Sequence, residues 1–278
     1  MQAAVIGTPV EQSKSPILHS AAYAALGIAG GWKYTKCEVS EDSLRAFVQQ
    51  LDGSWAGFSV TMPLKSAVIQ YLDEISAEAT QTNAVNTVVV KTDENKTRGL
   101  HLSGCNTDIY GIRQAFYEAS SLANHEELQG GGIILGSGAT ARSAANALKT
   151  VLQNSASKRI TVISRRKPAW IQEVELDWCS FENHTRINQL MNSSEYAVST
   201  LPWGAAKSLL PTIFPQTFPK VLECAFPKVL PFSIGGERML IHQAVLQVEL
   251  MTEHLGLRFE ADKIVEVMAT ALKKEARV

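Results

Sequence analysis

Cysteine is scarce in this sequence, and its four cysteines are far apart: Cys37, Cys105, Cys179 and Cys224. They form no C-x-x-C pair, so the pattern is typical neither of a zinc site nor of a disulfide framework. We expect small buried hydrophobic side chains at these positions and no bound metal. His19, His101 and His242 are likewise expected to be structural residues rather than metal ligands.

An excess of charge of one sign is also lacking. Lysine and arginine total 26 against 27 acidic residues, which gives a formal net charge of −1, and the longest local basic run is 165–167. This balance argues against a nucleic-acid or acidic membrane partner. No segment approaches the ~20 apolar residues of a membrane span, and the N-terminus has no basic leader, so we expect a cytoplasmic protein.

What the sequence does contain is an alternation of short β-branched runs with helical patterns. The first series comprises an apolar run at 3–7, a helix at 16–26, a strand at 32–39, a helix at 43–51 and a strand at 57–60. Alternation of this kind predicts parallel strands joined by helical crossovers. Residues 84–102 read instead as two strands joined by a polar turn, which predicts an antiparallel edge.

A second series of strands and helices follows, at 131–148, 159–166, 196–200 and 220–226. Six of the ten prolines lie between residues 202 and 231, so we expect this stretch to be rich in loops. Apolar residues return to helical spacing after residue 239. With 278 residues and 45% hydrophobic residues, the chain is predicted to fold as two α/β units with packed cores.

A glycine-rich loop opens the second series. An apolar run is followed at once by Gly136, Gly138 and Ala141, in the form G-x-G-x-x-A, and then by a helical pattern. This order favours a dinucleotide site, because the glycines allow a tight turn and a close approach, and the helix N-terminus receives a pyrophosphate. A purely structural turn is the alternative. The predicted cofactor-binding residues of the loop are Gly136, Ser137, Gly138, Ala139 and Thr140.

The end of the next strand indicates which dinucleotide. It reads Ser164, Arg165 and Arg166, where NAD-binding proteins place an acidic residue for the ribose hydroxyls. An arginine matches the charge and geometry of a 2′-phosphate, so the sequence favours NADP. The missing acid also argues against a methyltransferase that uses S-adenosylmethionine. The alternative is that both arginines are only a solvated strand end.

Near the N-terminus, "SKSPILH" allows two interpretations. Ser15 followed by Pro16 predicts an N-cap and a first helical residue. Ser13 and Ser15 would also face one side of an extended segment, so the same helix start could receive an anion. Lys14 beside the positive helix end is explained by neither interpretation.

Three further polar residues lie at strand or helix ends. A strand ends at Thr61, and Pro63 is the predicted first residue of a helix, which places Lys65 in its first turn. Lys65 is a candidate proton acceptor. Asn86 is predicted at the start of a strand and Asp108 in the first turn of a helix. Taken one at a time, each has an ordinary structural explanation as a turn or helix-start residue.

Taken together, these motifs resemble those of the shikimate dehydrogenases. "SKSP..H", "SVTMPLK", "AVNT", "GCNTD", "LGSGATARSA", "VSTLP" and "MLIHQA" occur in that family's order and near its spacing, over nearly the whole chain. The resemblance implies a split substrate domain with a mostly parallel sheet, formed by 1–104 plus 237–278. It also implies an inserted Rossmann-type NADP-binding domain at 105–236. The implied reaction is reversible hydride transfer between shikimate and NADP, which gives 3-dehydroshikimate.

The resemblance also implies roles for residues. Lys65 and Asp108 would be the catalytic pair, and Ser13 and Ser15 would hold the shikimate carboxylate. The ring substituents would contact Thr61, Asn86, Asp108 and Gln243. Thr200 and Gly236 would join the cofactor-binding residues named above.

The sequence departs from the family pattern at several positions. Ala225 and Leu230 stand where the family usually has tyrosine and threonine, Ser59 where many members have asparagine, and Asn83 where glycine is usual. Two alternatives therefore stay open: a quinate or shikimate dehydrogenase that uses NAD, and a catalytically weak NADP-binding regulatory protein. The expected partner is a small-molecule substrate, and the expected state is a monomer or a homodimer.

Overall fold

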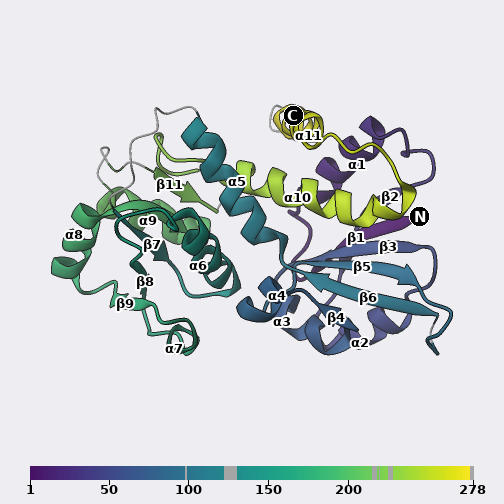
Figure 1. Cartoon of the computed structure of the whole chain (residues 1–278), viewed down its shortest axis with the longest axis horizontal. Coiled ribbons are helices and arrows are strands. Elements are labelled where there is room, and N and C mark those ends of the chain that lie inside the picture. The colour runs from purple at the N-terminus through teal and green to yellow at the C-terminus, as the bar shows by residue number, and fades with distance from the viewer. Residues whose placement is uncertain (98, 122–129, 215–217, 219, 225–227, 276–278) are drawn as a thin grey trace. The chain divides into compact units, whose positions relative to one another are not determined.

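The computed structural model describes residues 1–97, 99–121, 130–214, 218, 220–224 and 228–275. The chain forms two compact units, Met1–Thr107 with Ile241–Val278, and Asp108–Leu240. Each unit has its own sheet, of six and of five strands. The fold is mixed α/β with mostly parallel pairing, as the alternation of strands and helices predicts (Figure 1).

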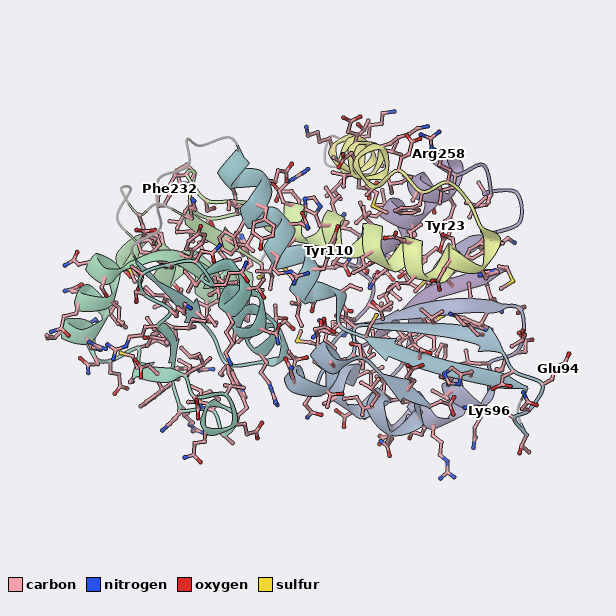
Figure 2. The ribbon with its side chains drawn as sticks, viewed as in Figure 1. Tyr23, Glu94, Lys96, Tyr110, Phe232 and Arg258 are labelled. Carbon is pink, nitrogen blue, oxygen red and sulfur yellow. The ribbon has the colours of Figure 1, made fainter. Side chains whose placement is uncertain are left out.

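The sheet of the first unit has the order β2-β1-β3-β5-β6-β4. Its strands are β1 (Gln2–Gly7), β2 (Lys33–Glu38), β3 (Trp55–Val60), β4 (Glu74–Ile75), β5 (Thr87–Thr92) and β6 (Leu100–Cys105). Strands β1, β2 and β3 are parallel, and β5 and β6 form the predicted antiparallel hairpin. Figure 2 shows Glu94 and Lys96 at the turn of this hairpin. The hairpin is not the edge of the sheet, because the two-residue β4 pairs with β6.

Helices cover both faces of this sheet (Figure 1). On one side are α2 (Glu41–Gln49) and α3 (Leu64–Ala67), with the 3-10 helix η1 (Val68–Tyr71) and α4 (Ala77–Thr82). Their core includes Leu44, Val48 and Leu64 against Phe58 of β3. On the other side are α1 (Ser15–Ala25), α10 (Gly236–Thr252) and α11 (Ala261–Glu275), with η2 (Glu253–Leu255) between the last two.

The sheet of the second unit is entirely parallel, with the order β11-β10-β7-β8-β9. Its strands are β7 (Gly131–Leu135), β8 (Ile160–Ser164), β9 (Asp177–Ser180), β10 (Ser194–Ser199) and β11 (Lys220–Glu223). The chain builds outward from β7 to β9 and then returns to the other side of β7 with β10. This is the doubly wound order, with its topological switch point between β7 and β10. The sequence interpretation missed β9.

Both faces of the second sheet carry apolar cores. Side chains of α5 (Thr107–Ser121) and α6 (Ala139–Val151) pack on one face, and those of α8 (His184–Ser193) and α9 (Trp203–Ile213) on the other. The short α7 (Ile171–Val174) follows β8. The proline-rich stretch is less irregular than predicted, because α9 continues through Pro211.

The cysteines are free thiols, as their spacing predicts, but only Cys179 is buried. Cys37, Cys105 and Cys224 are half-buried, so the expectation of four buried side chains is wrong for these three. Among the described residues, no helix is long and apolar enough to cross a membrane.

Candidate functional site

Backbone hydrogen bonds bring together the segments of three predicted site residues, Thr61, Lys65 and Asn86, at the carboxyl end of β3. The Val60 N–H donates to the Asn86 carbonyl oxygen at 2.8 Å, and the Val85 N–H donates to the Lys65 carbonyl oxygen at 2.8 Å. The segments that carry Thr61, Lys65 and Asn86 therefore lie side by side. Gly7 at the end of β1 has φ +155°, and a Cβ there would lie 2.4 Å from Thr61 Cγ2, so the close approach of these two strand ends requires glycine.

Asn86 is buried and is held by the start of α5. Its Oδ1 accepts from the Thr107 N–H at 2.8 Å and from the Thr87 hydroxyl at 2.8 Å. Its Nδ2 lies 3.5 Å from Gln243 Oε1, which also accepts from the Thr107 hydroxyl at 3.4 Å. The structure thus brings Asn86 and Gln243 together, although they are 157 residues apart in the chain.

A second glutamine on α10, Gln247, extends this buried network. Its Nε2 donates to Thr87 Oγ1 at 2.8 Å and to the Asn86 carbonyl oxygen at 3.3 Å. Its Oε1 accepts from the Ser59 hydroxyl at 2.8 Å, and Ser59 Oγ in turn accepts from the Tyr34 hydroxyl at 2.6 Å. A fully buried amide with these partners fixes the positions of three strands relative to α10.

The network reaches α1 through aromatic side chains. His19 is fully buried, stacks on Tyr34 with ring centroids 3.8 Å apart, and has Nε2 3.2 Å from Gln247 Oε1. Burial lowers the pKa of His19 to about 3, so the ring is neutral at ordinary pH. Burial raises the pKa of Tyr34, and hydrogen bonds with Ser59 and Ser15 oppose that rise. Tyr23 of α1, labelled in Figure 2, lies with its hydroxyl 3.3 Å from His19 Nδ1.

The start of α1 differs from its predicted form. Lys14 is the N-cap and Ser15 is already the first helical residue, so Ser15 is not the cap. Ser13 Oγ instead accepts from the Ser15 N–H at 3.3 Å, which satisfies one free donor of the helix start. Lys14 forms an ion pair with Glu275 of α11 at 3.7 Å. Both side chains are well exposed, so this pair explains the lysine but contributes little stability.

Lys65 and Asp108 lie at helix starts. Pro63 is the N-cap of α3 rather than its first residue, and Lys65 is half-buried in the only full turn of that helix. Asp108 is buried in the first turn of α5. It directly follows Thr107, whose N–H donates to Asn86, so the backbone of Asp108 is tied to the same strand edge.

In the second unit, the glycine loop lies at the switch point of the sheet. Gly136 follows β7 with φ +113°, a conformation that L side chains rarely adopt. A Cβ on Gly136 would lie 2.3 Å from Thr200 Oγ1. Thr200 follows β10 and donates to the Leu135 carbonyl oxygen through its N–H at 2.8 Å and its hydroxyl at 2.9 Å. The structure therefore brings Gly136 and Thr200 together in the crevice where doubly wound sheets bind ligands.

The loop leads into α6, and the space next to Gly138 is open. Gly138 is the N-cap of α6, and a Cβ there would meet no atom within 4 Å. Ser137 and Gly138 are exposed, while Ala139 and Thr140 are half-buried in the first turn. Exposed backbone donors at the N-terminus of a 13-residue helix favour an anion.

The predicted phosphate-binding strand end is only partly available to a ligand. Arg165 and Arg166 are exposed. Ser164 is buried, donates to the Arg166 carbonyl oxygen at 2.7 Å and accepts from Trp178 Nε1 at 3.0 Å. Ser164 therefore shapes the turn that presents the two arginines.

The end of β11 is packed closely against α10. A Cβ on Gly236 would lie 2.6 Å from the Glu223 carbonyl oxygen, so glycine is needed here for packing. The buried Glu223 carboxylate accepts from the Val229 and Leu230 N–H groups, each at 2.8 Å, and from Ser233. Leu230 joins the apolar core. Ala225, the other departure from the family pattern in this segment, lies outside the described residues.

The sequence interpretation missed the residues that support the site, namely Tyr34, Ser59, Thr87, Thr107 and Gln247. The only signal in the sequence was the helical spacing that places Gln243 and Gln247 one turn apart on one helix. Within the described ranges, no group of three or more His, Cys, Asp and Glu side chains could hold a metal ion.

The sequence of the chain is similar to proteins of known function. Residues 5–88 match the family model of the shikimate dehydrogenase substrate binding domain. The chain is 30% identical over 284 residues to a pentafunctional AROM polypeptide of Saccharomyces cerevisiae, a match that covers 91% of this chain and 17% of that protein. It is 39% identical over 140 residues to shikimate dehydrogenase (NADP(+)) of Methanococcus maripaludis, which covers 50% of this chain and 46% of that protein. The chain thus spans about a sixth of the AROM polypeptides that it matches.

Two solved structures share the fold over nearly their full length. Shikimate dehydrogenase of Mycobacterium tuberculosis has a TM-score of 0.77 at 28% identity and covers 97% of this chain and 99% of its own. The shikimate 5-dehydrogenase of Thermus thermophilus, solved in complex with shikimate, has a TM-score of 0.75 at 25% identity and covers 98% and 99%. The resemblance predicted from the motifs is confirmed: residues 5–88 match the shikimate dehydrogenase substrate binding domain, and the chain shares the fold of these two shikimate dehydrogenases.

Proposed function

We propose that the protein is a shikimate dehydrogenase that catalyses the reversible NADP-dependent reduction of 3-dehydroshikimate to shikimate, in the biosynthesis of chorismate and aromatic amino acids. The observation that carries the proposal is the buried amide network around Asn86, Gln243 and Gln247, next to the segments of Thr61 and Lys65. The M. maripaludis relative is named a shikimate dehydrogenase (NADP(+)), and the T. thermophilus structure contains shikimate.

In this proposal the unit Met1–Thr107 with Ile241–Val278, together with Asp108, the residue that follows Thr107, binds the substrate. Ser13 and Ser15 hold the carboxylate, since the Ser13 hydroxyl accepts from the Ser15 N–H and keeps its own proton to donate. Asn86 and Gln243 suit ring hydroxyls, because each amide carries both donors and an acceptor. Thr61 and the carboxylate of Asp108 complete the set of hydroxyl partners.

Lys65 is the proposed proton acceptor. Oxidation of a secondary alcohol removes a hydride from carbon and a proton from oxygen, so the site needs a base within hydrogen-bond reach of the hydroxyl. The Lys65 amine takes this proton, and Asp108 orients the amine and the hydroxyl. In the reverse direction the lysine ammonium returns the proton to the carbonyl oxygen as hydride arrives.

The unit Asp108–Leu240 fits NADP. The exposed Ser137 and Gly138, the open space at Gly138 and the N-terminus of α6 suit a pyrophosphate. Arg165 and Arg166, exposed at the end of β8, suit the 2′-phosphate. When bound, NADP supplies the hydride acceptor. Thr200 and Gly236 shape the crevice at the strand ends rather than contribute charge.

Initial rates with shikimate and quinate, each with NADP and with NAD, test the proposal. We expect the highest kcat/KM for shikimate with NADP. A preference for NAD, with either substrate, would instead identify a quinate or shikimate dehydrogenase of the NAD-dependent kind. NADP binding without turnover of either substrate would identify a regulatory protein and refute the enzyme.

Replacing the proposed base tests the mechanism. Lys65→Ala is expected to lower kcat much more than it raises KM for shikimate, because the amine acts in the proton-transfer step. Lys33→Ala, at an exposed lysine of the same unit, is the matched control and should leave both constants unchanged. A Lys65→Ala variant that changes KM alone would make Lys65 a binding residue only.

A further inference from the structure

The glycine loop is held by an indole from a different segment of the chain. Trp170 Nε1 donates to the Ser137 carbonyl oxygen at 3.0 Å, across 33 residues of sequence. Trp170 directly precedes α7, is only 8% exposed, and packs in the core that includes Ala141 and Ala145 of α6. Its ring is therefore fixed by packing, and its N–H has a defined direction.

This hydrogen bond sets the direction of a donor on the other side of the loop. In a planar trans peptide the C=O and the following N–H point in opposite directions. Because the Ser137 carbonyl points toward Trp170, the Gly138 N–H points away from it. Gly138 is the N-cap of α6, and a Cβ there would meet no atom within 4 Å. The indole thus orients one of the N–H groups that an anion at this helix start would meet.

Two residues of α6, Arg142 and Lys149, also hold the Trp170 segment on this helix. Arg142 Nη2 pairs with Glu173 Oε2 at 3.0 Å, and the Arg142 guanidinium lies 5.8 Å from the centre of the Trp170 ring. Lys149 Nζ donates to the Val174 carbonyl oxygen at 3.2 Å. The indole, the ion pair and the lysine all join residues 170–174 to residues 137–149. Three contacts therefore hold Trp170 in place relative to the start of α6.

A second indole of this unit acts on a different part. Trp178 Nε1 donates to Ser164 Oγ at 3.0 Å, and Ser164 Oγ donates to the Arg166 carbonyl oxygen at 2.7 Å. Trp178 therefore supports the turn of Arg165 and Arg166, whereas Trp170 supports the Ser137–Gly138 peptide. The two tryptophans thus support two separate segments, to which the proposed function assigns the pyrophosphate and the 2′-phosphate of NADP.

We propose that Trp170 is a positioning residue for the dinucleotide pyrophosphate: its indole N–H holds the Ser137 carbonyl so that the Gly138 N–H faces the ligand. The inference rests on the proposed function for the identity of the ligand. NAD and NADP share the pyrophosphate and differ only in the 2′-phosphate. Loss of the indole N–H must therefore weaken both dinucleotides by the same factor.

Titration calorimetry of the full chain with NADP and with NAD tests this role. In Trp170→Phe, Kd for both dinucleotides is expected to rise about three- to tenfold, the effect of one hydrogen bond, with the ratio of the two Kd values unchanged. In Trp178→Phe, Kd for NADP is expected to rise more than Kd for NAD. Trp203→Phe, at an exposed tryptophan of α9, is the matched control and should change neither.

A second variant separates the hydrogen bond from packing. Site-specific 3-benzothienylalanine at position 170 keeps the ring shape and replaces the N–H by sulfur, so it should reproduce the rise in both Kd values without loss of the fold. Unchanged Kd values in this variant, or a loss confined to NADP, would overturn the proposal. Wild-type protein that binds NADP but does not oxidise shikimate would refute the proposed function only, whereas wild-type protein that binds neither dinucleotide would refute both.

Discussion

The buried His19 predicts how the stability of the protein depends on pH. Its pKa is 6.5 when unperturbed, and burial lowers it to about 3 in the folded protein. Below pH 6.5 the unfolded chain therefore binds a proton that the folded chain does not, and stability is lost as the pH falls. Each unit of pKa difference corresponds to about 1.4 kcal/mol, so lowering the pH from 7 to 5 should remove about 2 kcal/mol through this residue.

Urea unfolding of wild type and His19→Gln at pH 7, 6 and 5 measures this contribution. Glutamine does not titrate, yet its amide can still donate to Gln247 as His19 does. The variant is expected to be less stable than wild type at pH 7, and the difference should shrink by about 2 kcal/mol at pH 5. Tyr23 and Tyr34, which contact the ring, stay neutral in this range because burial raises the pKa of both. A stability difference that is the same at pH 7 and pH 5 would refute the reasoning.

Two further predictions concern the supports of the two sites. Gln247→Leu removes the hydrogen-bond partner of Ser59 and Thr87, so it should lower the free energy of unfolding by about 2–4 kcal/mol and raise KM for shikimate. Glu249→Ala, at an exposed position of the same helix, is the control and should change neither quantity. A Gln247→Leu variant as stable as wild type would contradict this prediction. Gly136→Ala places a methyl group 2.3 Å from Thr200 Oγ1 at φ +113°. Calorimetric unfolding should therefore show a loss of about 2 kcal/mol in the free energy of unfolding, and calorimetric titration should show weaker binding of NADP. An unchanged affinity for NADP would mean that the dinucleotide binds elsewhere.

Much of the fold could be predicted because it is encoded locally. Alternating β-branched runs and helical patterns specify strands and crossovers without knowledge of the partner strand. The G-x-G-x-x-A loop is likewise a local requirement, since Gly136 must adopt a positive φ wherever the rest of the chain goes. The four-residue β9 and the two-residue β4 were not predicted, because segments this short contain too few residues to show the alternation of apolar and polar side chains typical of a strand.

The support of the site could not be predicted, because it consists of contacts between distant residues. Gln247 and Ser59 are 188 residues apart, and they become hydrogen-bond partners only when α10 packs on the sheet next to β3. The cap of α1 was misassigned for a different reason: the helix begins one residue earlier than expected, at Ser15, and the Ser13 hydroxyl accepts from the Ser15 N–H, which the spacing of the two serines does not reveal. Lys14 had no explanation until α11 brought Glu275 to it.

The division of the first unit into two stretches of sequence also sets the order in which the protein can be completed. The sheet is made before the second unit, but α10 and α11, which cover one of its faces, are made after it. During synthesis the hydrogen bonds of Ser59 and Thr87 with Gln247 cannot form until α10 has been made. The second unit is continuous in sequence, so it can fold as soon as it has been synthesised. The sheet without α10 and α11 is therefore the stage at which an exposed apolar face makes the nascent chain prone to aggregation.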